Sequence, residues 1–295
     1  MLLLDSGTRS FFIKFSIKLR DTEPGKDLRG ELKYEDLAPS ISGGWMRRVR
    51  LFNLIGSGRL VDFTLAWRYQ RALLEEMHFL RKTGSDFSEA VLLLEHDHVY
   101  TLGRAADEAN VLSEQLRGSS SLVRVERGGE VTYHGPGQLV VYPLLDLNRH
   151  KRDLHWYVRS LEEAVIGVLA EYGVPGERSE VNSGVWVGKR KLCAVGVTAS
   201  RWLTMHGLAV NVNCDLSKFE NIVPCGISDP ERGVTSLREV MGSDLVVVGD
   251  VAERLQRHLT KVFRHDHVIS ADESELATLL GQTPAVPKEV LLEAR

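Results

Sequence analysis

The chain has 295 residues, of which 43% are hydrophobic and 26% charged, and its formal net charge is −3. This composition is typical of a soluble globular protein with apolar material for one large core or two small ones. The weak negative charge provides no basic field that would attract nucleic acid or anionic lipid, so we expect neither as a partner. No apolar run approaches the roughly 20 residues of a membrane-spanning helix, and we expect no membrane insertion.

The three cysteines, Cys193, Cys214 and Cys225, have neither paired nor zinc-like spacing. We therefore expect no disulfide framework and no cysteine-rich metal site, and thiols of this kind indicate a reducing compartment. Two His-Asp-His triplets, at 96–98 and 265–267, resemble metal-binding sequences, but neither has a third ligand at a recognisable spacing. The sequence thus predicts no metal site.

Residues 1–48 differ from the rest of the chain, because prolines and glycines interrupt them and no hydrophobic period persists. Four basic residues accompany a single acid, Asp5, in the first twenty positions, which is a weak signature of an organelle transit segment. We interpret residues 1–48 as an N-terminal extension, either a transit segment or a disordered terminus. Residues 49–285 are expected to form one domain, followed by a tail at 286–295.

Hydrophobic periodicity predicts three long helices in this domain. Apolar residues recur at helical spacing over 59–82 and again over about 250–264. Between them, Asp153 is a suitable N-cap for a third helix, which Gly173 is expected to end.

Short apolar runs predict the strands. Buried strands are expected at 90–94 and 138–147. A strand at 122–125 is expected to lie beside the first, and a further strand is expected at 208–212. Segments 184–187 and 192–197 flank a turn at 188–191 and predict a hairpin. Because hairpins stand among the crossovers, the pattern indicates an α+β fold in which helices cover a mixed sheet.

One segment is unusually rich in glycine and is expected to be a loop between two strands. It reads Arg127-Gly128-Gly129-Glu130-Val131-Thr132-Tyr133-His134-Gly135-Pro136-Gly137-Gln138. Glycines let a ligand approach backbone N–H groups, so such a loop can form the wall of a binding site. It lacks the spacing of a P-loop or a dinucleotide-binding fingerprint, and taken alone a structural turn explains it as well.

Cys225 is the strongest candidate nucleophile, because Pro224 and Gly226 flank it and leave one side of the sulfur open. Cysteine is both a good nucleophile and a good leaving group near neutral pH when a neighbouring cation lowers the thiol pKa. An inert buried thiol is the alternative. Cys193, in an apolar strand, and Cys214, beside an acidic residue, are expected to be structural.

The cation that Cys225 would need has several candidates in the sequence. They are the basic residues of the predicted hairpin turn and two histidines, namely Lys189, Arg190, Lys191, His134 and His206. Spacing along the chain measures none of the distances to the sulfur. The Lys-Arg-Lys run is equally consistent with an ordinary exposed turn, and either histidine with a core residue.

Several motifs in chain order resemble the lipoyl(octanoyl) transferase family, which shares its fold with biotin and lipoate protein ligases. They are Tyr100 to Arg104, residues 127–138 with Tyr142-Pro143, Gly184-Val185-Trp186, Lys191 to Gly196, Thr204 to Asn211, and Phe219 to Ile227. The resemblance covers most of residues 49–265. The stretch from Asp153 to Tyr157 is closer to the cyanobacterial and plastid branch.

The resemblance implies transfer of an octanoyl group from octanoyl-acyl carrier protein to the target lysine of lipoyl domains, through an acyl thioester on Cys225. It implies that Lys191 lowers the pKa of this thiol and acts as a general acid and base. The acyl site that it implies consists of Arg127, Gly128, Gly129, Glu130, Val131, Thr132, Tyr133, His134, Ala194, Val195, Gly196, Gly207, Leu208 and Ala209.

Two glycines of this acyl site, Gly196 and Gly207, are expected to lie along the acyl chain, so that a side chain at either would shorten the slot. The sequence departs from the family pattern at His98, where proline is usual, at Ser183, where threonine is common, and at Cys193, where alanine is common. His98 is expected to alter a loop, and a thiol at Cys193 to lie near the site and sensitise it to oxidation.

The resemblance also implies that neither ATP nor a metal is required, because amide formation from a thioester is favourable. The expected acceptors are lipoyl domains of 2-oxoacid dehydrogenase complexes and the glycine cleavage H protein. We expect a monomer in an organelle, with the chloroplast favoured and the mitochondrion or cytoplasm as alternatives. Two rival functions are an ATP-dependent lipoate or biotin ligase and an inactive carrier-protein-binding module.

Overall fold

The computed structural model describes four segments of the chain, which are residues 46–56, 58–179, 182–224 and 232–282. The predicted extension lies outside these segments except for residues 46–48, and the predicted tail at 286–295 lies outside them as well. Within the described segments, no helix is both long and apolar enough to cross a membrane.

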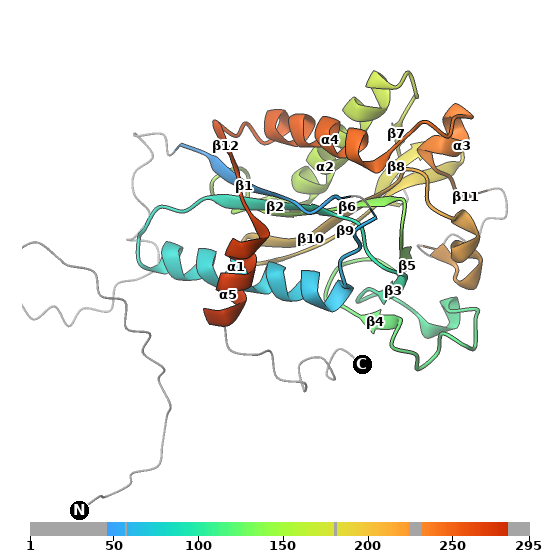
Figure 1. Ribbon diagram of the computed structural model, residues 1–295, viewed down its shortest axis with the longest axis horizontal. Helices are drawn as coiled ribbons and strands as arrows, with labels where there is room; N and C mark the ends of the chain where they lie inside the picture. Colours follow the sequence, from blue (N-terminus) through green and yellow to red (C-terminus); the bar gives the residue numbers. More distant parts are fainter. Residues whose placement is uncertain (1–45, 57, 180–181, 225–231, 283–295) are drawn as a thin grey trace, which may run out of the picture. The chain divides into compact units, whose positions relative to one another are not determined.

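A nine-stranded mixed sheet forms the centre of the fold (Figure 1). Its strands, in spatial order, are β12 (His267–Ser270), β1 (Arg48–Asn53), β2 (Glu89–Leu94), β6 (Gln138–Leu144), β10 (Leu203–Asn211), β9 (Arg190–Ser200), β8 (Gly184–Val187) and β7 (Glu177–Arg178), while β11 (Gly233–Val234) pairs with β9. Strand β1 pairs in parallel with β2 and β12, and the pairs from β2 to β7 are antiparallel. The predicted mixed sheet is confirmed.

A second sheet has three strands, β4 (Leu122–Arg124), β3 (Val99–Leu102) and β5 (Val131–His134), in that order. The prediction that 122–125 pairs with 90–94 is therefore wrong. The side chains of β4 are only partly buried, as befits the edge of a small sheet, whereas those of β2 are buried throughout. The predicted glycine-rich loop is also wrong in its middle, because β5 occupies it.

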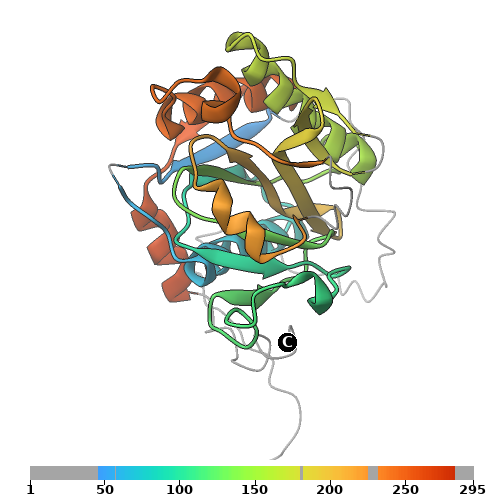
Figure 2. The same ribbon diagram turned by 90° about the vertical axis from the view of Figure 1, so that its right-hand side faces the viewer.

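Helices cover both faces of the main sheet (Figure 1). On one face lie α2 (Leu154–Glu171) and α4 (Val248–Val262), and on the other α1 (Phe63–Lys82) and α5 (Glu273–Gln282). The remaining helical turns are α3 (Leu237–Met241), η1 (Glu108–Asn110) and η2 (Leu216–Asn221). The three-stranded sheet lies on the α1 side of the main sheet, as Figures 1 and 2 both show.

Local signals explain where the helices begin and end. The Asp153 carboxylate accepts a hydrogen bond from the Trp156 N–H at 3.0 Å, so the predicted cap of α2 is confirmed. Gly173 follows this helix with φ of 70°, as a glycine stop requires. Helix α1 begins later than predicted, because Asp62 caps it through the Leu65 N–H at 2.8 Å.

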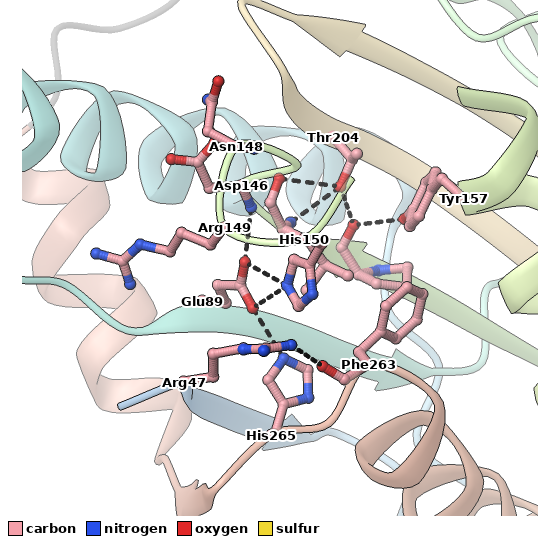
Figure 3. Close-up of polar contacts among 12 residues, drawn as sticks. Arg47, Glu89, Asp146, Asn148, Arg149, His150, Tyr157, Thr204, Phe263 and His265 are labelled. Carbon is pink, nitrogen blue, oxygen red and sulfur yellow. Dashed lines mark hydrogen bonds and ion pairs between the residues drawn. The ribbon is translucent and has the colours of Figure 1, made fainter. Parts of the chain in front are cut away.

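Glu89, the first residue of β2, is a carboxylate buried at the end of the sheet (Figure 3). Burial by itself would raise the pKa of Glu89, but hydrogen bonds from His150 and His265 outweigh it and lower the pKa to about 2. The Asp146 N–H donates a further hydrogen bond at 2.8 Å. A buried negative charge, which two histidines contact, therefore lies at the start of β2.

Candidate functional site

A cavity of about 350 Å³ lies where β5, β9 and β10 meet the start of α1. It is lined by Phe63, Thr101, Arg127, Gly128, Gly129, Glu130, Thr132, His134, Val140, Tyr142, Val158, Asn182, Ser183, Lys191, Ala194, Val195, Gly196, Val197, His206, Gly207, Leu208 and Ala209. Apart from Arg127, Glu130 and Lys191, this lining offers uncharged side chains and backbone, since burial keeps its histidines neutral, as shown below. Such a cavity suits an apolar ligand with one polar end.

Most residues of the predicted acyl site line this cavity, and so does Lys191. The exceptions are Val131 and Tyr133, which pack in the core beneath the small sheet. Alternate residues of a strand point to opposite faces, so Thr132 and His134 face the cavity while their neighbours cannot. Because residues 131–134 were expected to lie in a loop, this alternation of side chains between two faces was not predicted.

Lys191 lies within a strand and not in the predicted turn. The turn comprises Gly188 and Lys189, and β9 begins at Arg190. Lys191 is 3% exposed, and its Nζ lies 5.1 Å from the centroid of the Trp186 ring. The interpretation of this basic run as an exposed turn therefore holds for Lys189. Arg190 is exposed but begins the strand, and Lys191 is buried.

The segment after Cys225 returns to Lys191. Val234 of β11 is paired with Lys191, and the Thr235 N–H donates to the Lys191 carbonyl at 3.0 Å. Before Cys225, the Val223 N–H donates to the Asn110 carbonyl at 2.8 Å. Cys225 itself lies outside the described residues, so its predicted role stays a prediction.

The other two cysteines are buried, as predicted. Burial raises the pKa of the Cys214 thiol to about 12, which makes this group a poor nucleophile. Cys193 packs in the core against the α2 side of the sheet and does not line the cavity. Cys193 adjoins the lining residue Ala194, so it lies near the site, as expected, although its side chain packs on the opposite face of β9. The expected sensitivity to oxidation stays a prediction.

Arg127 fixes one wall of the cavity. Its Nη2 donates to the Thr101 carbonyl at 2.7 Å and to the Thr101 hydroxyl at 2.8 Å, and its Nη1 donates to the Gly128 carbonyl at 3.0 Å. Thr101 belongs to β3, so the guanidinium ties the glycine-rich segment to the small sheet. A buried cation held by backbone acceptors is a rigid feature of the wall.

The buried histidines around the cavity are neutral at pH 7. Burial lowers the pKa of His134 to about 3, and the neighbouring His96 contributes to this effect. Burial also lowers the pKa of His96 to about 4 and lowers that of His206. His96 contacts the Val61 carbonyl through Nδ1 at 2.7 Å and the Tyr142 hydroxyl through Nε2 at 2.8 Å.

Several lining residues were not predicted as site residues. Thr101, Tyr142 and Ser183 lie in or beside the quoted motifs, but the sequence analysis assigned them no role in the site. His206, a candidate cation in the sequence, also lines the cavity. Phe63 and similar helix residues carried none, because an amphipathic helix pattern does not reveal which apolar residue faces a cavity.

The two unusual polar replacements have identifiable contacts. The Nδ1 atom of His98 lies 2.7 Å from the Tyr133 hydroxyl. Gly135 makes room for this pair, because a Cβ there would lie 1.9 Å from the same hydroxyl. Ser183 lines the cavity.

The two glycines that were expected to lie along a bound chain differ in their surroundings. They pair across β9 and β10. A Cβ at Gly207 would lie 2.1 Å from the Val141 carbonyl oxygen, whereas at Gly196 the nearest atom would be Arg127 Cδ at 3.0 Å. The expectation that a side chain at Gly207 would only shorten the slot is wrong, since the obstacle is the backbone of β6.

We expect Gly207→Ala to lower the free energy of unfolding by about 2–3 kcal/mol or more, because β10 must move away from β6. Gly196→Ala should cost about 1 kcal/mol, because the Arg127 side chain can shift. Denaturant unfolding of both variants measures the difference. Equal losses would show that the β6 backbone is not the obstacle.

We expect acid to destabilise the protein partly through His96. Its pKa is about 4 when folded and about 6.5 when unfolded. The folded pKa is the lower one, so the stability is fully present above pH 6.5 and is lost as the pH falls towards 4. The free energy of unfolding of His96→Gln should depend on pH less steeply than that of wild type, by about 1.4 kcal/mol per pH unit near pH 5.

Chemical denaturation of the wild type and of this variant between pH 4.5 and 7 measures how steeply the free energy of unfolding depends on pH in each protein. The expected difference between the two slopes corresponds to the uptake of about one proton on unfolding. His267→Gln alters an exposed histidine of β12 and serves as the control. A slope in His96→Gln equal to that of the wild type would refute the prediction.

Comparison with known proteins places this site in a family. Residues 62–260 match the model of the lipoyl protein ligase A/B catalytic domain. The octanoyltransferase of the cyanobacterium Gloeobacter violaceus is 51% identical over 178 residues, which cover 60% of this chain and 78% of that protein. The chloroplastic octanoyltransferase of Arabidopsis thaliana is 40% identical over 228 residues, which cover 74% of this chain and 80% of that one.

Among solved structures, a putative lipoate protein ligase from T. acidophilum has a TM-score of 0.59 at 16% identity, over 81% of this chain and 93% of that chain. This likeness confirms the predicted fold. The family model matches more than half of the chain, and the relatives include cyanobacterial and chloroplastic proteins, as the motifs predicted. The chain therefore belongs to the lipoyl protein ligase A/B catalytic-domain family.

Proposed function

We propose that this protein is an acyltransferase that moves an octanoyl group from octanoyl-acyl carrier protein to the target lysine of lipoyl domains. The observation that carries this proposal is the buried Lys191 at the wall of a mainly uncharged cavity. The relatives named octanoyltransferase support the choice of acyl group. An eight-carbon chain can lie against the neutral lining while its carbonyl meets the polar end.

Cys225 is the proposed nucleophile. Cys193 and Cys214 are buried, which leaves Cys225 as the remaining thiol of the three. Its thiolate attacks the carbonyl of the donor thioester, a new carbon–sulfur bond forms, and the bond to the carrier's sulfur breaks. Thioester exchange leaves the number of thioester bonds unchanged, so this step is close to balanced.

Lys191 is the proposed general acid and base. As an ammonium it favours the Cys225 thiolate, and it gives its proton to the departing carrier thiolate. The neutral Lys191 amine then accepts a proton from the acceptor lysine, whose nitrogen attacks the acyl-enzyme carbonyl. The amide forms, the Cys225 thiolate leaves, and the starting protonation states are restored.

This sequence of steps needs no ATP and no metal, because the donor thioester is already activated. The ATP-dependent ligase is the rival within the fold, and it has no use for an acylated cysteine. We further propose that the protein acts as a monomer on 2-oxoacid dehydrogenase lipoyl domains and the glycine cleavage H protein. The chloroplast is the proposed compartment, supported by the chloroplastic relative and by the basic composition of the first twenty residues.

Incubation with octanoyl-acyl carrier protein alone should add one octanoyl mass to the protein, without ATP. Hydroxylamine should remove this mass, because a thioester is labile where an amide is not. Intact-mass spectrometry measures both steps. Cys225→Ala should gain no adduct, and Cys214→Ala is the matched control that should acylate normally. Undiminished acylation of Cys225→Ala would rule out Cys225 as the nucleophile.

Lys191→Ala should slow both acylation of the enzyme and transfer to the lipoyl domain, because one residue serves both steps. Lys191→Arg should recover acylation more than transfer, since a guanidinium keeps its charge but does not readily give up or accept a proton. Single-turnover rates of the two half-reactions provide the comparison. Transfer by the arginine variant at the wild-type rate would mean that Lys191 acts only as a fixed charge.

A further inference from the structure

A second group of reactive side chains lies outside the acyl cavity. Glu89 begins β2, His150 lies between β6 and α2, and His265 lies between α4 and β12 (Figure 3). None of the three lines the acyl cavity. Their side chains are each 1% exposed, so the chain buries three potential metal ligands drawn from distant parts of the sequence.

The potential ligand atoms converge on one point. The Nε2 atom of His150 lies 3.0 Å from both carboxylate oxygens of Glu89, and the Nε2 atom of His265 lies 2.8 Å from one of them. One such atom from each residue falls within a group no wider than 4.8 Å. Tetrahedral zinc with bonds of 2.0–2.1 Å separates its ligands by about 3.3 Å. The Glu89–His contacts need to lengthen by a few tenths of an ångström, whereas the widest pair of ligand atoms has to close by up to about 1.5 Å.

The donor set selects the kind of cation. Two imidazole nitrogens and one carboxylate suit Zn²⁺, whereas Mg²⁺ and Ca²⁺ prefer oxygen ligands throughout. His150 also lines a second cavity, of about 510 Å³, which has room for a water as fourth ligand. The Asp146 N–H holds the carboxylate from behind at 2.8 Å, as an outer-shell hydrogen bond does in metal sites.

Basic side chains limit the affinity, since the second cavity is also lined by Lys151, Arg159, Arg178 and Arg264. The two arginines drawn beside the site in Figure 3 do not block it. Arg149 donates to the Phe87 carbonyl at 2.7 Å and stacks on the Phe87 ring, and Arg47 Nη1 donates to the Phe263 carbonyl at 3.4 Å. Both guanidiniums therefore have partners other than the three ligand atoms. Their charge still repels a cation, so we expect weaker binding than in sites with several anionic ligands.

We propose that Glu89, His150 and His265 form a binding site for one Zn²⁺ ion, with water as the fourth ligand. This ion would join the start of β2, the connection before α2 and the turn before β12. That turn is already tied to β1, because the Asp266 carboxylate accepts from the Arg47 N–H at 2.8 Å. The chemical role is structural, and the proposal does not rest on octanoyl transfer.

The test uses the full-length protein, stripped of metal with a chelator and titrated with Zn²⁺ against a chromophoric competitor. We expect one bound zinc with a Kd of about 1 µM or below. Zinc at about a hundredfold excess over this Kd should raise Tm by about 5–10 °C. A wild-type protein that binds no zinc in this range, or whose Tm zinc leaves unchanged, overturns the proposal.

Variants identify the ligands. His150→Gln and His265→Gln should each weaken zinc binding by more than about tenfold and abolish the rise in Tm. His267→Gln, an exposed histidine two residues from His265, is the matched control and should behave as wild type. Cys225→Ser should also bind zinc normally. Wild-type affinity in His265→Gln, or lost binding in Cys225→Ser, would place the ion elsewhere and overturn the proposal.

Should the histidine variants fail to fold, Co²⁺ in the wild-type protein decides the question. We expect the intense d–d absorption of a tetrahedral site without a thiolate charge-transfer band. A thiolate band, or the weak spectrum of octahedral Co²⁺, overturns the proposal. Because none of the three ligands lines the acyl cavity, either result is independent of the acylation of Cys225.

Discussion

The shape of the acyl cavity depends on the buried guanidinium of Arg127. A buried cation is costly unless hydrogen bonds replace its water, and Thr101 and Gly128 supply the acceptors. The backbone can approach this closely because Gly103 and Gly196 have no side chain. A Cβ at Gly103 would lie 2.1 Å from the Gly129 carbonyl oxygen and 2.8 Å from the guanidinium nitrogen Nη1. The Arg127 side chain and the Gly129 backbone together therefore require a glycine at position 103.

Strand alternation divides β5 between the cavity and the core of the small sheet. Thr132 and His134 of β5 face the cavity, while Val131 and Tyr133 pack in the core of the small sheet. Gly196 of β9 is paired with Gly207 of β10, and neither residue places a side chain where these strands line the cavity. The cavity is therefore a product of two sheets in contact, and neither sheet contains it alone.

Two pairs of buried histidines have different roles in this fold because the groups that surround them differ. His96 and His134 are buried among rings and neutral groups, and burial keeps them uncharged beside the cavity. His150 and His265 instead contact the buried carboxylate of Glu89. The first pair adds no charge to the surroundings of the acyl site, and the second supplies the donor set on which the proposed zinc site depends.

The sequence by itself determined the mixed sheet, the long helices, the family and most residues of the acyl site. These predictions rest on hydrophobic periodicity, on helix caps such as Asp153 and on contiguous motifs. Each of these signals involves residues that are close in sequence, so it can be recognised without the tertiary structure. Strands β1 and β12 were missed. In β1, arginines alternate with apolar residues, and β12 is exposed, so neither shows a continuous apolar run. Their pairing is between residues more than two hundred positions apart.

Only the tertiary structure decided which side chains meet. Lys191 follows two exposed basic residues, and its burial comes from the register of β9, which spacing cannot reveal. The obstacle at Gly207 is a carbonyl of a neighbouring strand, and the partners of His265 come from β2 and from the connection before α2. Contacts of this kind depend on strand order and register, and these are set by how the whole hydrophobic core packs.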